Sequence, residues 1–270
     1  MSGRLSGRAA IVTGAGRGIG AAIVARLMDE GAQVAALDLN LADAQASGAT
    51  LAVACNVADS QSVAAAVQAA RAAFGRLDIA VNNAGIGQAA NDGSEQFYGA
   101  MAQRNAELAE QGSSNVIVDQ LIHMGDDGWA GVMAVNLNGT FYTCREFTRV
   151  LAADGNPGAI INVSSTSAQS GEGSPHYCAS KAAVIGLTRQ LARELAPRRI
   201  RVNAIAPGPT NTPVMQGIPA EWIASMEAAI PLGRMADPAE IAAAVAFLAS
   251  DDASYVNGSV LVANGASYYF

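Results

Sequence analysis

Tyr177 and Lys181 stand four residues apart in the pattern Tyr-x-x-x-Lys, which puts both side chains on one face of a helix. An ammonium beside a phenol favours the phenolate, so we expect Lys181 to lower the pKa of Tyr177 from its usual value of about 10. Such a tyrosine can exchange a proton with a carbonyl or an alcohol. Lys181 is also the only lysine among the 16 basic residues. Arginine serves everywhere else, which indicates that this position needs a compact ammonium whose pKa can shift.

Two serines come shortly before this pair. Ser164 and Ser165 follow the run Ile-Asn-Val at 161–163 and precede Tyr177 by thirteen and twelve residues. A hydroxyl at such a strand end can hydrogen-bond a substrate oxygen held beside the tyrosine. Two serines at a strand end are otherwise ordinary loop residues, so the pattern alone leaves open which of them would act.

A glycine cluster, Thr-Gly-Ala-Gly-Arg-Gly-Ile-Gly, spans residues 13–20 between an apolar run and a helical pattern. Glycines let the backbone turn sharply and approach a pyrophosphate, while the following helix N-terminus offers free N–H groups and a partial positive charge. Two registers fit: Gly14, Gly18 and Gly20, or a looser set of Gly16, Gly18 and Ala21. Either register predicts a dinucleotide-binding turn.

Asp38 lies twenty residues beyond Gly18, at the end of the second apolar run. A carboxylate there can accept hydrogen bonds from both hydroxyls of the adenosine ribose, and its charge repels a 2′-phosphate. The sequence therefore favours NAD(H) over NADP(H). Arg17 argues in the other direction, because a basic side chain in the loop could pair with a 2′-phosphate.

The elements that must hold these residues follow from the apolar pattern. Short apolar runs predict strands at residues 9–12, 34–37, 51–55, 77–81, 159–163, 200–205 and 260–262. Helical periodicity predicts helices at residues 19–30, 60–74, 129–151, 177–195 and 238–249. Strands that are apolar on both faces belong in a parallel sheet covered by helices, and the strict alternation indicates βαβ units. Right-handed crossovers then make the fold α/β and doubly wound.

Composition and charge exclude several functional classes. Hydrophobic residues make up 51% of the 270 residues and the mean hydropathy is +0.22, enough for a large core. A net charge of −7 argues against nucleic acid, whose phosphates require a basic surface. The best apolar run, residues 241–249, is far shorter than the roughly 18 residues that a membrane span needs. Because the N-terminus also carries no signal-peptide pattern, we expect a cytoplasmic protein without a membrane partner.

Neither cysteine nor histidine spacing predicts a metal site. Cys55, Cys144 and Cys178 are far apart and odd in number, which favours inert thiols in a reducing compartment. His123 and His176 share no ligand spacing, and we expect both on the surface or in loops.

Further motifs accompany the glycine cluster, Ser165 and the Tyr-x-x-x-Lys pattern; they are Asn82-Asn83-Ala84-Gly85, Val135-Asn136-Leu137, Pro207-Gly208, Thr210 and Thr212. Together these motifs make the chain resemble the short-chain dehydrogenase/reductase family over essentially its whole length. The resemblance implies a single Rossmann-like domain over residues 1–270, with a seven-stranded parallel sheet between two helix layers. It also implies a homotetramer that transfers hydride between a nicotinamide and a ketone or secondary alcohol.

The resemblance assigns catalytic roles by position. Tyr177 would be the general acid/base, and Ser165 would bind and polarise the substrate oxygen. Ser165 is preferred to Ser164 because the family places this serine last in the strand-end pattern, although the spacing to the tyrosine is about one residue short. Lys181 would tune Tyr177 and hold the nicotinamide ribose, and Asn136 would fix a water that relays protons.

The resemblance also assigns a cofactor site. Its residues would be Gly14, Arg17, Gly18, Ile19, Gly20, Asp38, Asn56, Val57, Asn83, Ala84, Gly85, Tyr177, Lys181, Pro207, Gly208, Thr210 and Thr212. Asn56 stands where the family usually has an aspartate at the adenine, a contact that an amide can also make.

One long segment departs from the family pattern. Gly85 and Asn136 are about twice as far apart as in the family, so residues 88–127 are expected to be largely an insertion. Phe97, Met101 and Leu108 trace an amphipathic helix within residues 94–112. The segment follows a strand end, where ligands bind in such sheets. It is equally consistent with a lid, a subunit contact or a surface excursion without a role.

The segment after Thr212 matches the family's substrate loop. Its apolar residues are Val214, Met215, Ile218, Trp222, Ile223 and Met226. They predict a hydrophobic secondary alcohol or ketone, either alicyclic, aromatic or lipid-like, although packing onto the sheet would account for them as well.

Two alternatives remain. One is an NADPH-dependent 3-oxoacyl-thioester reductase acting on acyl-carrier-protein or CoA substrates; Asp38 and the acidic net charge weigh against it. The other is a non-catalytic dinucleotide-binding protein, which the presence of Asn136, Ser165, Tyr177 and Lys181 together argues against.

Overall fold

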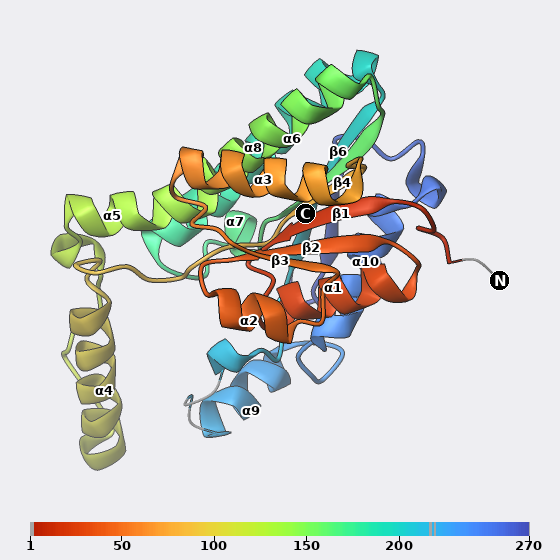
Figure 1. Ribbon diagram of the computed structural model, residues 1–270. Helices are drawn as coiled ribbons and strands as arrows, with labels where there is room; N and C mark the ends of the chain where they lie inside the picture. Colours follow the sequence, from red (N-terminus) through yellow and green to blue (C-terminus); the bar gives the residue numbers. More distant parts are fainter. Residues whose placement is uncertain (1–2, 216–217, 219, 270) are drawn as a thin grey trace.

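A single seven-stranded sheet organises the computed structural model, which describes residues 3–215, 218 and 220–269 (Figure 1). The strands are β1 (Ala9–Thr13), β2 (Gln33–Asp38), β3 (Leu51–Ala54), β4 (Ile79–Asn82), β5 (Gly158–Val163), β6 (Ile200–Pro207) and β7 (Val260–Ala263). Their order is β3-β2-β1-β4-β5-β6-β7, and every neighbouring pair is parallel. The predicted α/β, doubly wound Rossmann-like fold is thereby confirmed. The strand order reverses between β1 and β4, the point where such sheets bind ligands.

Helices cover both faces of the sheet. The helices of the described chain, which include these covering helices, are α1 (Gly18–Asp29), α2 (Leu41–Ala46), α3 (Ser60–Phe74), α4 (Ser94–Gln111), α5 (Asp126–Met133), α6 (Gly139–Asp154), α7 (Ser167–Ser170), α8 (Pro175–Leu195), α9 (Ala220–Ala229) and α10 (Pro238–Ala249). Short 3₁₀ turns lie at Leu121–His123, Ala196–Arg198, Pro213–Met215 and Asp251–Ala253. In the described part of the chain, no helix combines the length and hydropathy needed to cross a membrane.

The core forms two layers because successive strand residues point to opposite faces. In β1, Ala10 and Val12 pack with α1 and α10, while Ala9 and Ile11 pack with α3 and α6. All four side chains are fully buried. Figure 1 shows α3, α6 and α8 on one side of the sheet, with α1 and α10 on the other. Burial on both faces is the physical reason that the strands read as continuous apolar runs.

The helix boundaries reflect local capping. The Asp59 side chain accepts from the N–H of Gln61 at the start of α3, and Gly75 ends that helix in the left-handed conformation. At α10, Asp237 and Glu240 form a capping box around Pro238. These signals explain why both helices begin and end where the sequence predicts.

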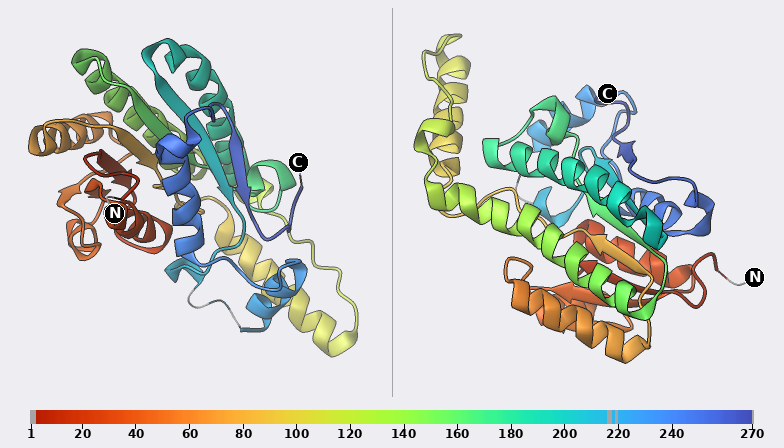
Figure 2. Two further views of the ribbon diagram at one scale, coloured as in Figure 1. Left: turned by 90° about the vertical axis from the view of Figure 1, so that its right-hand side faces the viewer. Right: turned by 90° about the horizontal axis from the view of Figure 1, so that it is seen from above.

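One predicted helix differs from expectation, and another forms as expected but has no buried residue. The helix predicted at residues 129–151 begins earlier and is interrupted, because Ala134–Asn138 form a π-helical turn between α5 and α6. The helix predicted within residues 94–112 forms as α4, but none of its residues is buried. We call residues 88–127 the arm; Figures 1 and 2 show its helix α4 extending away from the sheet and its covering helices. Apolar spacing predicts a helix face, but it does not supply a neighbour for that face to pack against.

Candidate active site

The predicted site residues gather at the carboxyl edge of the sheet. The glycine loop follows β1, Asp38 ends β2, and the Asn-Asn-Ala-Gly motif lies at the end of β4. Ser164 and Ser165 follow β5, and Pro207 ends β6. Because all the strands are parallel, these segments from distant parts of the chain meet at one edge, and α8 brings Tyr177 and Lys181 to them.

Lys181 is buried at 4% exposure within α8. Its Nζ donates to the carbonyl of Val163 at 2.9 Å and lies 5.7 Å from the centre of the Tyr177 ring. Burial lowers the pKa of Lys181 to about 8, because desolvation disfavours the ammonium. The ammonium therefore stays within reach of the tyrosine while its charge is poorly solvated.

Tyr177 lies in the first turn of α8, where its hydroxyl faces Ser165. Burial raises the pKa of Tyr177, and the Ser165 hydrogen bond acts in the opposite direction without cancelling it. The expectation that Lys181 lowers this pKa is therefore wrong for the chain alone. The reason is that the phenolate loses solvation on burial, while the lysine Nζ is turned to the Val163 carbonyl.

The geometry distinguishes the two candidate serines. Ser164 is buried, and its hydroxyl donates to the carbonyl of Lys181 at 2.8 Å, so it ties β5 to α8. Ser165 contacts Tyr177, and its Oγ also accepts from the N–H of Ser167 at 3.1 Å. Ser165 is therefore the serine whose hydroxyl stands beside the phenol.

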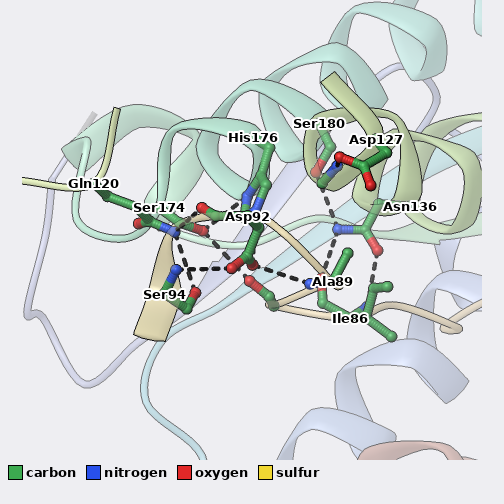
Figure 3. A network of polar contacts seen from close by, with 12 residues as sticks. Ile86, Ala89, Asp92, Ser94, Gln120, Asp127, Asn136, Ser174, His176 and Ser180 are labelled. Atoms are coloured by element: carbon green, nitrogen blue, oxygen red, sulfur yellow. Dashed lines mark hydrogen bonds and ion pairs between the residues drawn. The ribbon is translucent and has the colours of Figure 1, made fainter. Parts of the chain in front are cut away.

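Asn136 lies in the π-helical turn and is 1% exposed. Its Oδ1 accepts from the N–H of Ile86 at 2.9 Å, and its Nδ2 donates to the carbonyl of Ile86 and to Ser180 Oγ, each at 3.0 Å (Figure 3). A Cβ on Gly85 would lie 3.2 Å from Lys181 Nζ, so this close approach favours glycine. Asn136 thus holds the segment that leaves β4 against α8; its predicted water-relay role stays a prediction.

The glycine loop is closely packed. Gly14 and Gly18 have φ of +60° and +55°, and a Cβ on Gly14 would lie 2.7 Å from Ala84 Cα. A Cβ on Gly20 would overlap the Gly14 carbonyl oxygen. Asn83 Nδ2 donates to that same carbonyl at 2.9 Å. A Cβ on Gly16 would likewise lie 2.5 Å from Asp43 Cβ, so close packing applies to glycines of both registers. The contacts of Gly14 and Asn83 fix the loop against the end of β4.

Asp38 faces the glycine loop. Its Oδ2 accepts from the N–H of Gly16 at 2.9 Å, and its Oδ1 accepts from the N–H of Asn40 at 3.1 Å. Arg17 is exposed and occupies the N-cap position of α1 without capping it. Asn56 is exposed at the end of β3.

The remaining predicted residues frame the same edge. Ile19 and Val57 pack into the two core layers, and Ala84 N–H donates to Thr13 Oγ1 at 3.1 Å. Gly208 N–H donates to Ala263, and Thr210 Oγ1 donates to the Gly208 carbonyl. A Cβ on Gly18 would lie 3.4 Å from Thr212, so the segment after β6 lies beside the glycine loop.

The predicted substrate segment is more exposed than packing onto the sheet would allow. Val214 is 73% exposed, Trp222 is 37% exposed, and no described residue of α9 is buried. Met215, Ile218, Ile223 and Met226 are half-buried. These apolar side chains are available to cover an apolar ligand.

A cavity of about 600 Å³ lies elsewhere, at the amino ends of the strands. Its lining includes Arg8, Asp78, Arg199, Arg201 and Tyr255. None of the predicted site residues lines this cavity, so the cavity and the candidate active site are at opposite ends of the strands.

Known proteins resemble this chain along its length. A family model described as short chain dehydrogenase matches residues 8–116, and one described as Enoyl-(Acyl carrier protein) reductase matches residues 108–266. D-threitol dehydrogenase of Mycolicibacterium smegmatis is 40% identical, over 97% of this chain and 93% of the relative. A crystal structure of a short-chain type dehydrogenase/reductase from Mycobacterium marinum is 31% identical, has a TM-score of 0.82 and covers 97% of this chain and 96% of its own.

The chain belongs to the short-chain dehydrogenase/reductase family. Two further relatives are cis-4-hydroxycyclohexanecarboxylate dehydrogenase of Sinomonas cyclohexanicum, 39% identical over 96% of this chain and 95% of the relative, and human (3R)-3-hydroxyacyl-CoA dehydrogenase, 35% identical over 98% and 97%. The protein is therefore an oxidoreductase of the alcohol–ketone class, and a nicotinamide dinucleotide is its cofactor.

The residues present fit this cofactor of the short-chain dehydrogenase/reductase family. The first turn of α1 has no side-chain cap and no acidic residue, so its N–H groups can receive a pyrophosphate. Close packing leaves no room for a side chain at Gly14 or Gly20. Among the described residues, no three His, Cys, Asp or Glu side chains form a cluster that could hold a metal ion.

One polar pair beside this dehydrogenase site is not predicted by the sequence. The expectation that His176 lies on the surface or in a loop is wrong, because its side chain is fully buried in the first turn of α8 and contacts Asp92 (Figure 3). His123, in contrast, is exposed in the arm. The two partners are 84 residues apart in sequence, and no spacing rule joins them. The position of His176 next to Tyr177 is the only signal in the sequence.

Proposed function

We propose that the protein is an NAD(H)-dependent dehydrogenase that interconverts a hydrophobic secondary alcohol with its ketone. The observation that carries the reaction is the placement of the Ser165 hydroxyl beside Tyr177, with the buried ammonium of Lys181 5.7 Å from the tyrosine ring. These are the groups needed to bind one oxygen atom and move one proton on it.

The proton steps follow from this arrangement. During alcohol oxidation, Tyr177 takes the hydroxyl proton while the Ser165 hydroxyl holds the same oxygen; during ketone reduction, Tyr177 returns the proton. The nicotinamide, when bound, accepts or supplies the hydride. The Lys181 ammonium, 5.7 Å from the centre of the Tyr177 ring, would hold the ribose of the bound nicotinamide.

The choice of NAD(H) rests on Asp38. Its carboxylate is directed at the glycine loop through Gly16, where it would meet the adenosine ribose and repel a 2′-phosphate. Arg17 is exposed and forms no side-chain cap on α1, so its guanidinium could contact a 2′-phosphate. Arg17 is therefore the residue that favours NADP(H).

The choice of a hydrophobic substrate rests on the exposed apolar segment after Thr212, which includes Val214 and Trp222. The relative named for cis-4-hydroxycyclohexanecarboxylate supports an alicyclic alcohol. The relative named for D-threitol points instead to a small polyol.

The test is turnover by the purified chain on a panel of alicyclic, aromatic and long-chain secondary alcohols, with small polyols and sugars alongside, each with NAD+ and with NADP+. We expect NAD+ reduction with the hydrophobic members. Reduction with polyols alone would overturn the substrate class.

Tyr177→Phe should abolish turnover and leave cofactor affinity nearly intact. If turnover survives in this variant, Tyr177 is not the acid/base.

A second candidate is an NADPH-dependent 3-oxoacyl-thioester reductase. The relative named (3R)-3-hydroxyacyl-CoA dehydrogenase favours a thioester substrate. Asp38 and the net charge of −7 oppose it, because CoA and acyl carrier proteins are acidic and require a basic rim. Faster oxidation of NADPH than NADH by acetoacetyl thioester would select this candidate. A non-catalytic role would require that no alcohol or ketone in either assay reacts.

We further propose a homotetramer located in the cytoplasm, with residues 88–127 inserted in one dehydrogenase domain. The three free cysteines support a reducing compartment, since burial raises the pKa of Cys55 to about 11 and keeps its thiol protonated. Exposed apolar residues on α5 and α6, Trp129 and Phe141, support subunit contacts.

A further inference from the structure

His176 is fully buried in the first turn of α8, directly before Tyr177. Its Nδ1 lies 2.9 Å from Ser174 Oγ, and its Nε2 lies 3.0 Å from Asp92 Oδ2 (Figure 3). A neutral ring that carries its proton on Nε2 satisfies both contacts, because Nε2–H donates to the carboxylate and Nδ1 accepts from the Ser174 hydroxyl. The Gly87 carbonyl, at 3.4 Å, is the more distant acceptor open to that hydroxyl. Both ring nitrogens of this buried imidazole therefore have partners.

Asp92 connects the two chain segments at the base of the arm, residues 89–94 leading into α4 and the segment around Gln120 after it. Its Oδ2 accepts from the N–H of Ala89 and its Oδ1 from the N–H of Ser94, each at 2.9 Å, in the first segment. Its carbonyl accepts from Gln120 Nε2 at 2.8 Å, in the second segment. Burial raises the pKa of Asp92, but the hydrogen bonds outweigh burial and lower the pKa to about 2. The carboxylate that faces His176 is therefore charged.

The first turn of α8 needs an external support. The first four N–H groups of a helix have no partner within the helix. Ser174 occupies the N-cap position, yet its side chain makes no capping hydrogen bond, because its hydroxyl is at the His176 ring. No side-chain cap holds this turn; the buried contact of His176 with Asp92, and the longer contact of Ser174 with the Gly87 carbonyl, link the turn that carries Tyr177 to the segment after β4.

We propose that His176 is a positioning residue, which ties the base of the arm to the first turn of α8 and so fixes the Tyr177 hydroxyl beside Ser165. The inference rests on the proposed acid/base role of Tyr177. On this proposal the base of the arm helps to position a catalytic residue, although no residue of the arm's helix α4 is itself buried. Because coupling between two segments is reciprocal, disturbing either end of the pair should loosen the other.

The kinetic test compares His176→Leu with His176→Gln. A shift of about 1 Å at an acid/base group costs about 10- to 100-fold in rate, so we expect His176→Leu to lower kcat by that factor. The KM for NAD+ should change by less than about twofold, because the glycine loop is untouched. His176→Gln should recover most of kcat, since its amide can donate to Asp92 in place of Nε2–H. His123→Leu, at the other histidine of the chain, is the matched control and should keep the wild-type rate.

Equal losses in the Leu and Gln variants, or a loss seen only in the KM for NAD+, would overturn the proposal. Hydrogen exchange measured on the same full-length chains gives a readout that does not need substrate. His176→Leu should speed amide exchange at residues 89–94 by at least about tenfold, and Asp92→Asn should do the same at residues 178–181, the first hydrogen-bonded amides of α8.

Changes confined to the substituted segment would contradict the coupling. The two proposals fail separately. If no alcohol reacts but exchange is coupled in both directions, the proposed function fails and the connection stands. If alcohols react normally in His176→Leu, the positioning role fails and the function stands.

Discussion

Lys181 is a buried cation whose Nζ donates to the carbonyl of Val163. The position combines a compact charge, a lowered pKa and closeness to the Tyr177 ring, three properties that arginine cannot supply together. The same burial makes the residue costly for folding, because an ammonium loses its hydration. Activity and stability therefore make opposite demands at this one position.

Replacement of Lys181 by arginine tests the activity side. Lys181→Arg keeps the charge but spreads it over a larger planar group, so we expect kcat to fall by about 100-fold or more. Steady-state kinetics of the variant, with circular dichroism to show that it folds, measures the effect. Retention of more than about a tenth of the activity would mean that charge alone suffices.

Replacement of Lys181 by methionine tests the stability side. Lys181 has a pKa of about 8 in the folded chain and an ordinary value of 10.5, so between these values the unfolded state binds more protons and wild-type stability rises with pH. We expect the free energy of unfolding of wild type to gain up to about 3 kcal/mol relative to Lys181→Met between pH 8 and 10.5. Urea unfolding of both proteins across this range measures the difference, and parallel curves would contradict the burial argument.

The proposed preference for NAD(H) rests on Asp38. Asp38→Ala removes the acceptor for the ribose hydroxyls and the repulsion of a 2′-phosphate. We expect the ratio of kcat/KM for NAD+ to that for NADP+ to fall by about 10- to 100-fold. Asp29→Ala removes an exposed charge at the far end of α1 and should leave the ratio unchanged. An unchanged ratio in Asp38→Ala would point to Arg17 as the deciding residue.

At the scale of elements, sequence patterns located the strands to within about two residues, because strands buried on both faces must read as apolar runs. They also located α10 in full from Pro238 to Ala249, since its caps are local. They did not show the π-helical turn around Asn136 or the His176–Asp92 contact, which depend on packing between segments far apart in the chain. The apolar spacing of α4 correctly predicted a helix, but it left open whether the helix packs against anything, and no residue of α4 is buried.

The arm provides the element-scale prediction. Ser94 Oγ and Gln120 Nε2 are 3.2 Å apart, so a short Gly/Ser linker from Ser94 to Gln120 can replace residues 95–119, which include the rest of α4. Because no residue of α4 is buried, we expect the deletion to change the free energy of unfolding by less than about 1 kcal/mol. Urea unfolding checks this, with NAD+ affinity as a control that should not move. A large loss of stability would show that α4 is covered in the assembled protein.

At the scale of the whole molecule, the proposed tetramer accounts for apolar surface that one chain leaves uncovered. Trp129 and Phe141 are each 41% exposed on α5 and α6, which lie on either side of the π-helical turn. The Arg145 guanidinium lies over the Phe141 ring at 5.3 Å, so this face combines aromatic and cationic groups, a composition enriched at subunit interfaces.

The prediction concerns the mass in solution. Four copies of the 27.4 kDa chain should elute as a particle of about 110 kDa in light scattering coupled to size exclusion. Phe141→Glu places a charge on the proposed interface and should reduce the mass to that of a dimer or monomer. The helix itself should tolerate this change, because a glutamate one turn before Arg145 forms a favourable pair. Gln68→Glu, on the exposed face of α3, adds the same charge elsewhere and should leave the mass unchanged. A wild-type chain that elutes as a monomer would require another explanation for this aromatic face.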